Sequence, residues 1–490
     1  MKKIIKYILL VSVILSIGSC EKNLDPTLYG TITTKNFFLT SQDLDVATTA
    51  IYHEMRLGGW APYMFSDGSS LVMDEVATGE WTTKWSWNDF LNGNWAINGA
   101  MTTQFYYWLG TAVTQATYTL AKIEDSPVEE SIKNKYAAEV RALRAFFVYD
   151  IYRLYGPMPL IVEKDKALYP DPDYKPERPT ADEVEQFVKT ELRLAADALP
   201  VTQDQYGRLT KGAALQYLLK FHMKKHAWND ALLIANEIIG LNVYKLEPDY
   251  AKIFSAQNEK NKELIFVITG NPIEQYGNHT YANIIPGDFK SPYGNTLQGW
   301  NGHRMPWAFY DSFNSNDKRR NLALSQYENT SGKTINLRTS GDIGALPLKY
   351  GIDPQAVGIW AGNDKVMDRF AEVILFKAEA LNELKGPNQE SIDLINSVRS
   401  RAFDNYAGSA NELKLADFPD MVSLRVHILK ERGWEFWYEG KRREDLIRMG
   451  KYIEVGQQNA SNFGDKNMLF PVPANVIIEN SKIKQNPGYN

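Results

Sequence analysis

The chain has 490 residues, of which 44% are hydrophobic, so it is long enough to bury a large core and to contain more than one domain. Its 54 lysines and arginines face 59 aspartates and glutamates, which gives a formal net charge of -5. This mildly acidic balance argues against a nucleic-acid partner, because phosphate backbones are held by concentrated positive charge. A single cysteine excludes an internal disulfide, so packing must hold the fold together.

The first 20 residues have the organisation of a lipoprotein signal. Three lysines among the first six residues precede an apolar stretch over 7–17, which is too short to cross a bilayer as a helix. Two small residues then stand directly before Cys20, and this arrangement resembles the lipobox at which a signal peptidase cleaves and a lipid is attached. We therefore expect residues 1–19 to be removed, Cys20 to carry the lipid, and residues 20–40 to form the anchor and tether.

Apolar residues at helical spacing predict amphipathic helices over 41–56, with Ser41 as the cap, and over 131–155. The apolar stripe of the second helix is wide, which indicates a helix nearly surrounded by protein, and a Gly-Pro pair ends it. A proline-rich surface connection over 163–179 follows. Thr180 is then placed to cap the next helix.

Tryptophans gather in the segment 60–108, which holds half of the 12 in the chain. Glycines and asparagines interrupt this segment, so we expect much of it to be loop, where large rings are less readily buried in a regular core. The candidate ligand contacts in this segment are Trp81, Trp85, Trp87, Trp95 and Asn92.

Two predicted helix pairs share an architecture. The first pair joins 211–225 to 227–239, and the second joins 366–384 to 389–403 through a Gly-Pro-Asn turn. Antiparallel pairs with small residues where the helices touch resemble tetratricopeptide units. Because the period is irregular, we expect a helical scaffold embedded in a larger fold rather than a free-standing array.

Between the pairs, residues 264–269 (LIFVIT) are the best strand candidate, because the run is short and rich in β-branched residues. The irregular segment 270–306 follows and carries a second group of aromatic residues among glycines and asparagines. Flat rings can stack on the apolar C–H face of a sugar, and neighbouring amides and charged groups can hydrogen-bond its hydroxyls. The candidate contacts in this second segment are Tyr276, Tyr293, Trp300 and Arg304.

Three stretches resemble the SusD/RagB family of outer-membrane nutrient-uptake lipoproteins, and the likeness covers nearly the whole chain. Residues 20–26 (CEKNLDP) resemble the lipidated start of the family, and residues 139–160 (EVRALRAFFVYDIYRLYGPMPL) resemble its central buried helix. Residues 428–450 (ILKERGWEFWYEGKRREDLIRMG) resemble its most recognisable block. One departure is KRRED at 441–445, where an aromatic residue commonly precedes the aspartate, and it affects packing more than function.

The resemblance implies a mainly α-helical fold with tetratricopeptide-like pairs, long loops and a few short strands. It implies an N-terminal part over 41–260 and a C-terminal part over 261–490, which we expect to form one compact unit. It also implies a non-enzymatic lipoprotein of the outer membrane, facing the exterior. Such a protein binds glycan, uses no cofactor, and delivers its cargo to a SusC-like TonB-dependent transporter.

The residues alone leave other functions open. The cargo could be a peptide or another large nutrient, or the aromatic residues could serve only the contact with the transporter. A glycoside hydrolase would need paired carboxylates beside an aromatic cleft, and Asp74, Glu75 and Glu80 lie next to the tryptophans. Surface carboxylates are usually solvated, however, and the family resemblance does not support hydrolysis.

Metal and nucleophile motifs are weak. His222 and His226 (HMKKH) have the spacing of metal ligands on a helix, but the lysines between them repel a cation and the glutamate of HExxH is absent. Residues 329–334 (NTSGKT) imitate the end of a phosphate loop without its first glycine. We therefore expect no metal site and no catalytic residue.

Overall fold

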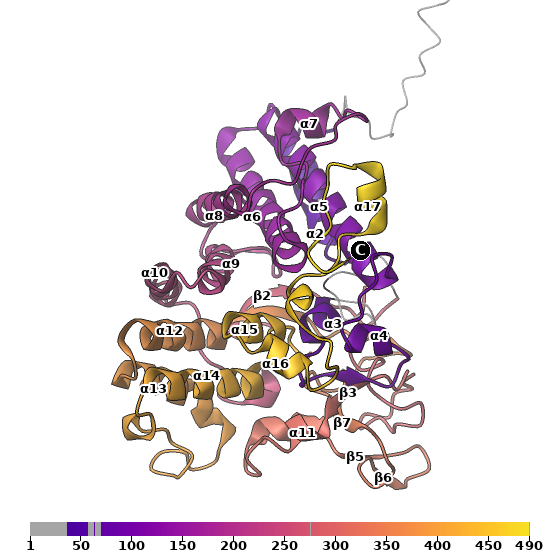
Figure 1. The fold of residues 1–490 in the computed structure, drawn as a ribbon, viewed down its shortest axis with the longest axis vertical. Coiled ribbons are helices and arrows are strands. Elements are labelled where there is room, and N and C mark those ends of the chain that lie inside the picture. Colours follow the sequence, from indigo (N-terminus) through magenta and orange to yellow (C-terminus); the bar gives the residue numbers. More distant parts are fainter. Residues whose placement is uncertain (1–36, 57–62, 64–69, 275, 490) are drawn as a thin grey trace, which may run out of the picture.

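The computed structural model describes residues 37–56, 63, 70–274 and 276–489 (Figure 1). The fold is mainly α-helical with a few short strands, as expected from the family resemblance. Cys20 and the rest of the expected signal lie outside the described residues. Among the helices that are described, none combines the length and apolar character needed to cross a membrane.

The first described helix, α2 (Ser41–His53), packs against α5 (Ala100–Glu124) and α6 (Glu130–Tyr155). Its cap is Thr40 rather than the expected Ser41. The Thr40 hydroxyl accepts from the backbone N–H of Asp43, whose carboxylate accepts from the Thr40 N–H. Threonine and serine are both common N-cap residues, so the sequence does not decide between neighbours, and the extended backbone of Thr40 identifies it as the cap.

Helix α6 is the central helix of the N-terminal part and is buried on almost every side, as its wide apolar stripe predicted. It packs against α5 and α8 (Ala181–Ala198). Gly156 ends it with a φ of 78°, a conformation that favours glycine. Thr180 caps α8, as predicted, in a reciprocal box with Glu183.

The two helix pairs form one stack (Figure 1). The first pair is α9 (Lys211–Lys224) and α10 (Trp228–Gly240), and the second is α12 (Phe370–Lys385) and α13 (Gln389–Arg399). Helix α10 packs against α12, which joins the pairs, and α14 (Met421–Phe436) covers α12 as well. The predicted helical scaffold is therefore present as a continuous layer.

The predicted start of the second pair was wrong by four residues. Residues 365–369 form strand β8 (Lys365–Arg369), which pairs antiparallel with β2 (Leu264–Ile268), the strand that the sequence predicted. A short apolar run has the same appearance at the start of a buried helix and in a buried strand. The partner strand, about a hundred residues away, decides between them.

A four-stranded antiparallel sheet was not predicted. Its order is β1 (Thr82–Thr83), β3 (His303–Pro306), β7 (Gly344–Pro347) and β4 (Ala323–Leu324). Each strand has only two to four residues, too few to show an alternating pattern in the sequence. The sheet joins segments that are distant in the chain and lies beside the helical stack (Figure 1).

The other named elements are short. They comprise α3 (Ser70–Glu75), α4 (Asn88–Leu91), α7 (Lys164–Leu168), α11 (Trp307–Tyr310), α15 (Arg442–Arg448), α16 (Tyr452–Gly456), α17 (Ala474–Glu479), the hairpin of β5 (Gln326–Glu328) and β6 (Thr334–Asn336), and the 3₁₀ turns η1 (Tyr250–Lys252), η2 (Lys318–Leu322), η3 (Ser400–Ala402), η4 (Leu415–Asp417) and η5 (Asp465–Met468).

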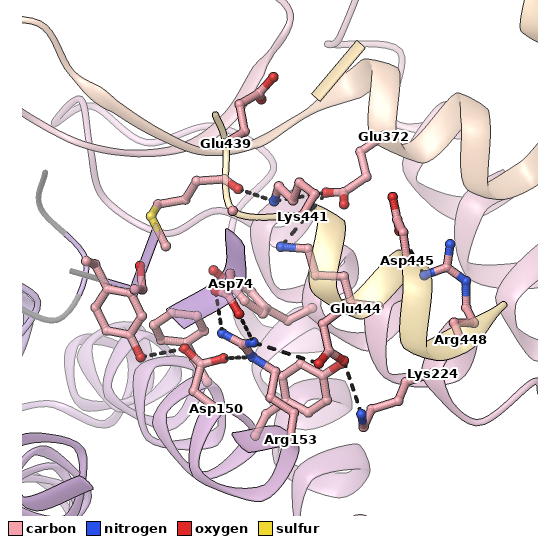
Figure 2. Close-up of a pocket in the computed structure, with 18 of the residues that line it drawn as sticks. Asp74, Asp150, Arg153, Lys224, Glu372, Glu439, Lys441, Glu444, Asp445 and Arg448 are labelled. Carbon is pink, nitrogen blue, oxygen red and sulfur yellow. Dashed lines mark hydrogen bonds and ion pairs between the residues drawn. The ribbon is translucent and has the colours of Figure 1, made fainter. Parts of the chain in front are cut away.

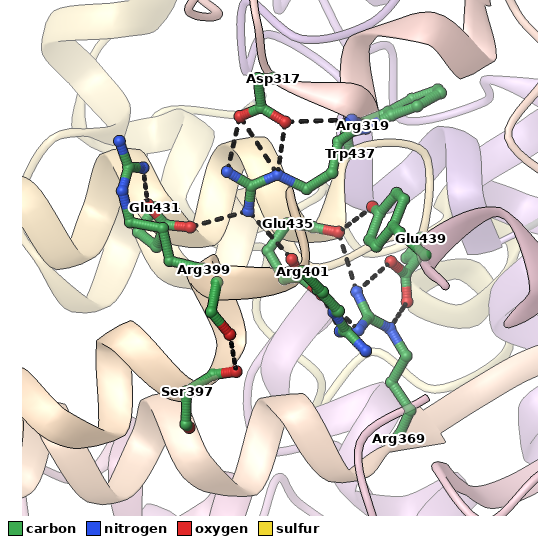
Figure 3. A network of polar contacts seen from close by, with 12 residues as sticks. Asp317, Arg319, Arg369, Ser397, Arg399, Arg401, Glu431, Glu435, Trp437 and Glu439 are labelled. Carbon is green, nitrogen blue, oxygen red and sulfur yellow. Dashed lines mark hydrogen bonds and ion pairs between the residues drawn. The ribbon is translucent and has the colours of Figure 1, made fainter. Parts of the chain in front are cut away.

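A buried network of charges holds the C-terminal part together (Figure 3). Glu431, Glu435 and Glu439 recur every four residues along and just beyond α14, so they reach the same side. With two further carboxylates they face five cations. The members are Glu263, Asp317, Glu431, Glu435, Glu439, Arg319, Lys349, Arg369, Arg399 and Arg401.

Glu435 is the centre of this network. Its carboxylate lies 2.6 Å from Arg369, 2.6 Å from Arg401 and 3.0 Å from Arg319. Burial by itself would raise the pKa of Glu435, but Arg401, Arg369 and Arg319 hold it far below its usual range. The side chain is therefore charged, and its partners are buried with it.

The change Glu435→Gln tests the network. It keeps the side-chain shape but leaves three buried arginines facing a neutral amide, so we expect the free energy of unfolding to fall by roughly 3–5 kcal/mol. Urea unfolding of the purified protein measures this loss. The control is Asp404→Asn, which breaks an exposed pair with Lys318 and should cost less than about 1 kcal/mol. Equal losses in the two variants would contradict a special role for the buried network.

Candidate ligand-binding surface

Pairing of β1 with β3 brings the two predicted aromatic segments together. Thr82 lies opposite Arg304 and Thr83 opposite His303, and the Lys84 N–H donates to the Gly302 carbonyl at 2.9 Å. The tryptophans that follow β1 therefore lie beside the loop that leads into β3. Segments separated by 215 residues share one surface.

The ring of Trp85 lies directly on Gly302. A Cβ atom at position 302 would come within 2.3 Å of two ring atoms, so only glycine allows this contact. The Trp85 Nε1–H donates to the Trp300 carbonyl at 3.4 Å, which ties the two aromatic segments together. Trp87 continues the group, with its ring centroid 5.0 Å from that of Trp85.

A third loop completes this surface. Asn278 and Ala361 exchange two backbone hydrogen bonds of 2.9 Å, which join the loop before Trp300 to the loop over 353–361. As a result, the His279 ring lies 4.9 Å from Trp300 and 4.5 Å from Trp360. We name the resulting row of half-buried rings the aromatic belt, which consists of Trp87, Trp85, Trp300, His279 and Trp360.

The aromatic belt is uncharged. Burial lowers the pKa of His279 to about 4, so the imidazole is neutral at pH 7. Below the belt, His303 is fully buried against Trp81, Trp85 and Trp87, with ring centroids 5.0–6.5 Å apart. Burial, and secondarily Arg304, lowers the pKa of His303 to about 3.

Of the nine residues predicted to contact ligand, five have an aromatic ring that is half-buried or exposed. Trp85, Trp87 and Trp300 are members of the belt and are half-buried. Tyr276 and Tyr293 lie outside the belt and are 58% and 55% exposed. The backbone of Gly277, the neighbour of Tyr276, lies against Trp360, so that tyrosine is close to one end of the belt.

Three of the other four predicted contacts lie inside, beneath the surface. Trp81 and Trp95 are only 4% and 5% exposed, and Arg304 is fully buried, so none of the three presents a face to a surface ligand. The ring of Trp95 lies 4.1 Å from that of Phe470, near the C-terminus. Asn92 is half-buried at the end of α4. The expected loop composition was present, but distant segments cover the side chains of Trp81 and Trp95.

Sequence reasoning missed two members of the belt. Trp360 lies in GIWAGN at 358–363, an aromatic residue among glycine and asparagine, and that composition could have identified it. His279 carries no comparable signal. Its position between two tryptophans depends on the pairing of loops far apart in the chain.

The carboxylates that a glycoside hydrolase would use are buried. Asp74 pairs with Arg153 at 2.9 Å, Glu75 accepts from the Gly440 N–H at 2.9 Å, and Glu80 pairs with Arg442 at 2.7 Å. Burial raises the pKa of Glu80 to about 7 although Arg442 opposes the shift. These carboxylates serve internal contacts and do not flank the belt.

A charged cavity lies between α3, α6, α9, α12 and α15 (Figure 2). Its volume is about 80 Å³, which is small beside the roughly 300–1,000 Å³ of typical ligand pockets. Its wall is self-neutralising, with Arg153 between Asp74 and Asp150, and Lys224 3.1 Å from Glu444. We regard it as a small internal space between packed helices, lined by ion pairs, rather than as a glycan site.

Metal ligation finds no support in the described ranges, where no group of three or more His, Cys, Asp or Glu side chains is arranged to hold an ion. His222 is buried near the end of α9, and His226 lies beyond that helix with its ring stacked on Trp228 at 4.9 Å. The two histidines therefore do not share a helix face. Residues 329–333 of the NTSGKT segment form the turn of the β5–β6 hairpin, and Thr334 begins β6.

The change His303→Gln tests the buried neutral histidine. The unfolded chain takes up a proton near the ordinary pKa of 6.5, whereas the folded chain does so near 3, so acidification favours unfolding. Between pH 7 and pH 5 the wild type should lose about 2 kcal/mol more stability than the variant. Urea unfolding at both pH values measures the difference, and parallel losses would show that His303 is protonated in the fold.

Two family models match this chain. One, described as the SusD family, matches residues 344–489, and the other, described as starch-binding associating with outer membrane, matches residues 35–223. A SusD-like protein of Formosa agariphila, P2, is 27% identical, with 98% of each chain covered. The starch-binding protein SusD of Bacteroides thetaiotaomicron is 25% identical, with 83% of each chain covered.

Solved structures share the fold. A laminarin-binding SusD-like protein superposes with a TM-score of 0.76 at 21% identity, covering 92% of this chain and 100% of the other. The surface glycan-binding protein A of Bacteroides thetaiotaomicron, in complex with laminarihexaose, has a TM-score of 0.73 at 21% identity, with 91% and 99% covered. Models of the SusD type thus match both ends of the chain, and relatives named SusD or SusD-like align with most of its length, so the SusD family is the one that this protein resembles.

Proposed function

We propose that this chain is a non-enzymatic lipoprotein of the outer membrane that binds glycan with the aromatic belt. It passes the glycan to a SusC-like TonB-dependent transporter. The observation that carries the proposal is the belt itself, in which rings from three loops meet on one surface. Tryptophan rings offer flat apolar faces for the C–H side of a sugar, and loops on a rigid scaffold are where proteins place binding residues.

The comparisons support this proposal at the level of the family. A relative is named for starch binding, a neighbour in structure for laminarin binding, and one family model for association with the outer membrane. The lipidated Cys20, the exterior orientation and the transporter are inferred from the family and from the sequence before Cys20. The buried carboxylates favour binding over hydrolysis, because a hydrolase must bring two of them to the sugar.

We also propose that the parts over 41–260 and 261–490 form one compact unit. Contacts between them support this, because β1 pairs with β3 and the Phe470 N–H donates to the Leu154 carbonyl at 2.8 Å. The cavity in Figure 2 is likewise lined by helices of both parts. A belt built from both parts requires such a rigid arrangement.

Alanine substitution in the belt tests glycan binding. Trp85→Ala, Trp300→Ala and Trp360→Ala should each weaken binding about tenfold or more, because central tryptophans dominate binding energy. Calorimetry with a panel that includes laminarin and starch measures the loss, and the recovered glycan should be unchanged in length. The control is Tyr169→Ala, which removes an exposed ring beside α7, at the far end of the molecule in Figure 1.

Several outcomes would count against this function. Equal effects of the belt and control substitutions would remove the belt from the binding site. Release of new reducing ends during incubation would favour a hydrolase. Binding of peptides in place of every glycan would favour the peptide-cargo alternative.

Cys20→Ser tests the anchor. Without the thiol no thioether to lipid can form, so the variant should move from the membrane fraction to the soluble fraction of the cell. Immunoblotting of the two fractions measures the distribution, with Ser19→Ala as the matched control that keeps the cysteine. A variant that stays with the membrane would show that another segment anchors the protein.

A further inference from the structure

A groove lies beside β2. It consists of two adjoining cavities of about 200 and 240 Å³, lined by residues of α2, of the loop before α9 and of β2. Together the cavities reach the range of roughly 300–1,000 Å³ that is typical of ligand pockets. We name them the Tyr206 groove, after an exposed residue that lines both. The wall that the two cavities share comprises Gln205, Tyr206, Gly207, Arg208, Phe266 and Val267.

Tyr206 is an aromatic side chain held in a fixed position at the surface. The residue is 38% exposed, although its hydroxyl lies 2.7 Å from the Asp364 carboxylate and 2.8 Å from the Glu259 carbonyl. The Lys260 ammonium approaches one face of the ring, 5.5 Å from its centre. A ring that is already oriented loses little conformational freedom when a ligand binds against it.

The rest of the groove combines apolar and polar groups. Phe266 and Val267 of β2 line both cavities and are almost fully buried, so they form an apolar floor. His53 and Gln205 line the groove and are exposed. The Gln205 side chain is oriented because its Oε1 accepts from the Arg208 Nε–H at 2.9 Å. A flat ring and an apolar floor beside an imidazole and an amide suit a sugar, which has an apolar C–H face and a rim of hydroxyls.

Tyr276 connects this groove to the aromatic belt. Arg56 and Thr269 both line the groove, and the Arg56 guanidinium donates to the backbone carbonyls of Thr269 and Tyr276. Tyr276 is 58% exposed, and the backbone of the next residue lies against Trp360, a member of the belt. A ligand that extends from Trp360 past Tyr276 therefore arrives at the Tyr206 groove.

We propose that the Tyr206 groove is a second glycan subsite, which takes the continuation of a chain already held on the aromatic belt. This inference rests on the proposed glycan-binding function and specifies the ligand as a long glycan. When one chain occupies both sites, the second contact is intramolecular, so its free energy adds to that of the first. A chain that covers only the belt lacks this gain.

The first experiment needs no variant. Oligosaccharides of increasing length, prepared from each glycan of the binding panel with laminarin and starch included, are titrated into the wild-type protein by calorimetry. Affinity should rise while the belt fills and then about tenfold more once the chain reaches the groove. Hydrogen exchange should show that long chains protect residues 203–208 as well as the loops of the belt, whereas short chains protect the belt loops alone.

The variant Tyr206→Ala removes the ring from the groove and leaves the belt intact. The ratio of long-chain to short-chain affinity should therefore fall about tenfold. Gln205→Ala removes an amide that can bond a sugar hydroxyl, and it should lower the same ratio by a smaller factor. The control is Tyr169→Ala, which removes an exposed ring beside α7 and should keep the wild-type ratio. Circular dichroism checks that each variant is folded.

The outcomes separate this subsite from the proposed function. Three results would each overturn the second subsite and leave glycan binding by the belt standing. They are an affinity that stops rising once the belt is filled, an unchanged ratio in folded Tyr206→Ala protein, and an absence of protection over 203–208 with long chains. Absence of binding to every glycan of the panel, at every length, would overturn the proposed function itself.

Discussion

Three arginines around the buried carboxylate of Glu435 fix the framework on which the aromatic belt depends. They come from η2, from the end of β8 and from the turn after α13, so one carboxylate joins three segments to α14 (Figure 3). The next carboxylate, Glu439, holds Lys349 and Arg369. The loop that carries Trp360 runs between these two cations and is therefore anchored at both ends by the network.

The surface itself depends on close backbone contact rather than on long strands. Trp85 can lie on β3 only because residue 302 has no side chain, and its indole N–H reaches the Trp300 carbonyl. Loops held in this way bring rings together without a regular array of strands. Beside these rings, Lys84 and Arg304 both donate to the carboxylate of Asp342, which ties the segment after β1 to the sheet a second time.

Much of the fold was predictable because it rests on local signals. The stripe of α6 and the helix pairs repeat at helical spacing, Thr180 caps α8 where its sequence position predicted, and LIFVIT showed the composition of a strand. For the candidate site, the sequence indicated the right segments but did not show which residues in them reach the surface. Trp85, Trp87 and Trp300 were singled out together with Trp81 and Trp95, which are buried. Whether a ring is covered depends on residues such as Phe470, hundreds of positions away.

The sequence by itself determined the helical class, the family resemblance, the expected lipid attachment at Cys20 and the two aromatic segments. Each of these depends on residues that are close together in the chain. The tertiary structure alone decided that the two segments meet, that Trp360 and His279 extend them, and that Asp342 pairs with Lys84. Strands of two to four residues and single salt bridges leave no period in a sequence. Their existence depends on contacts that form only when distant parts of the chain fold together.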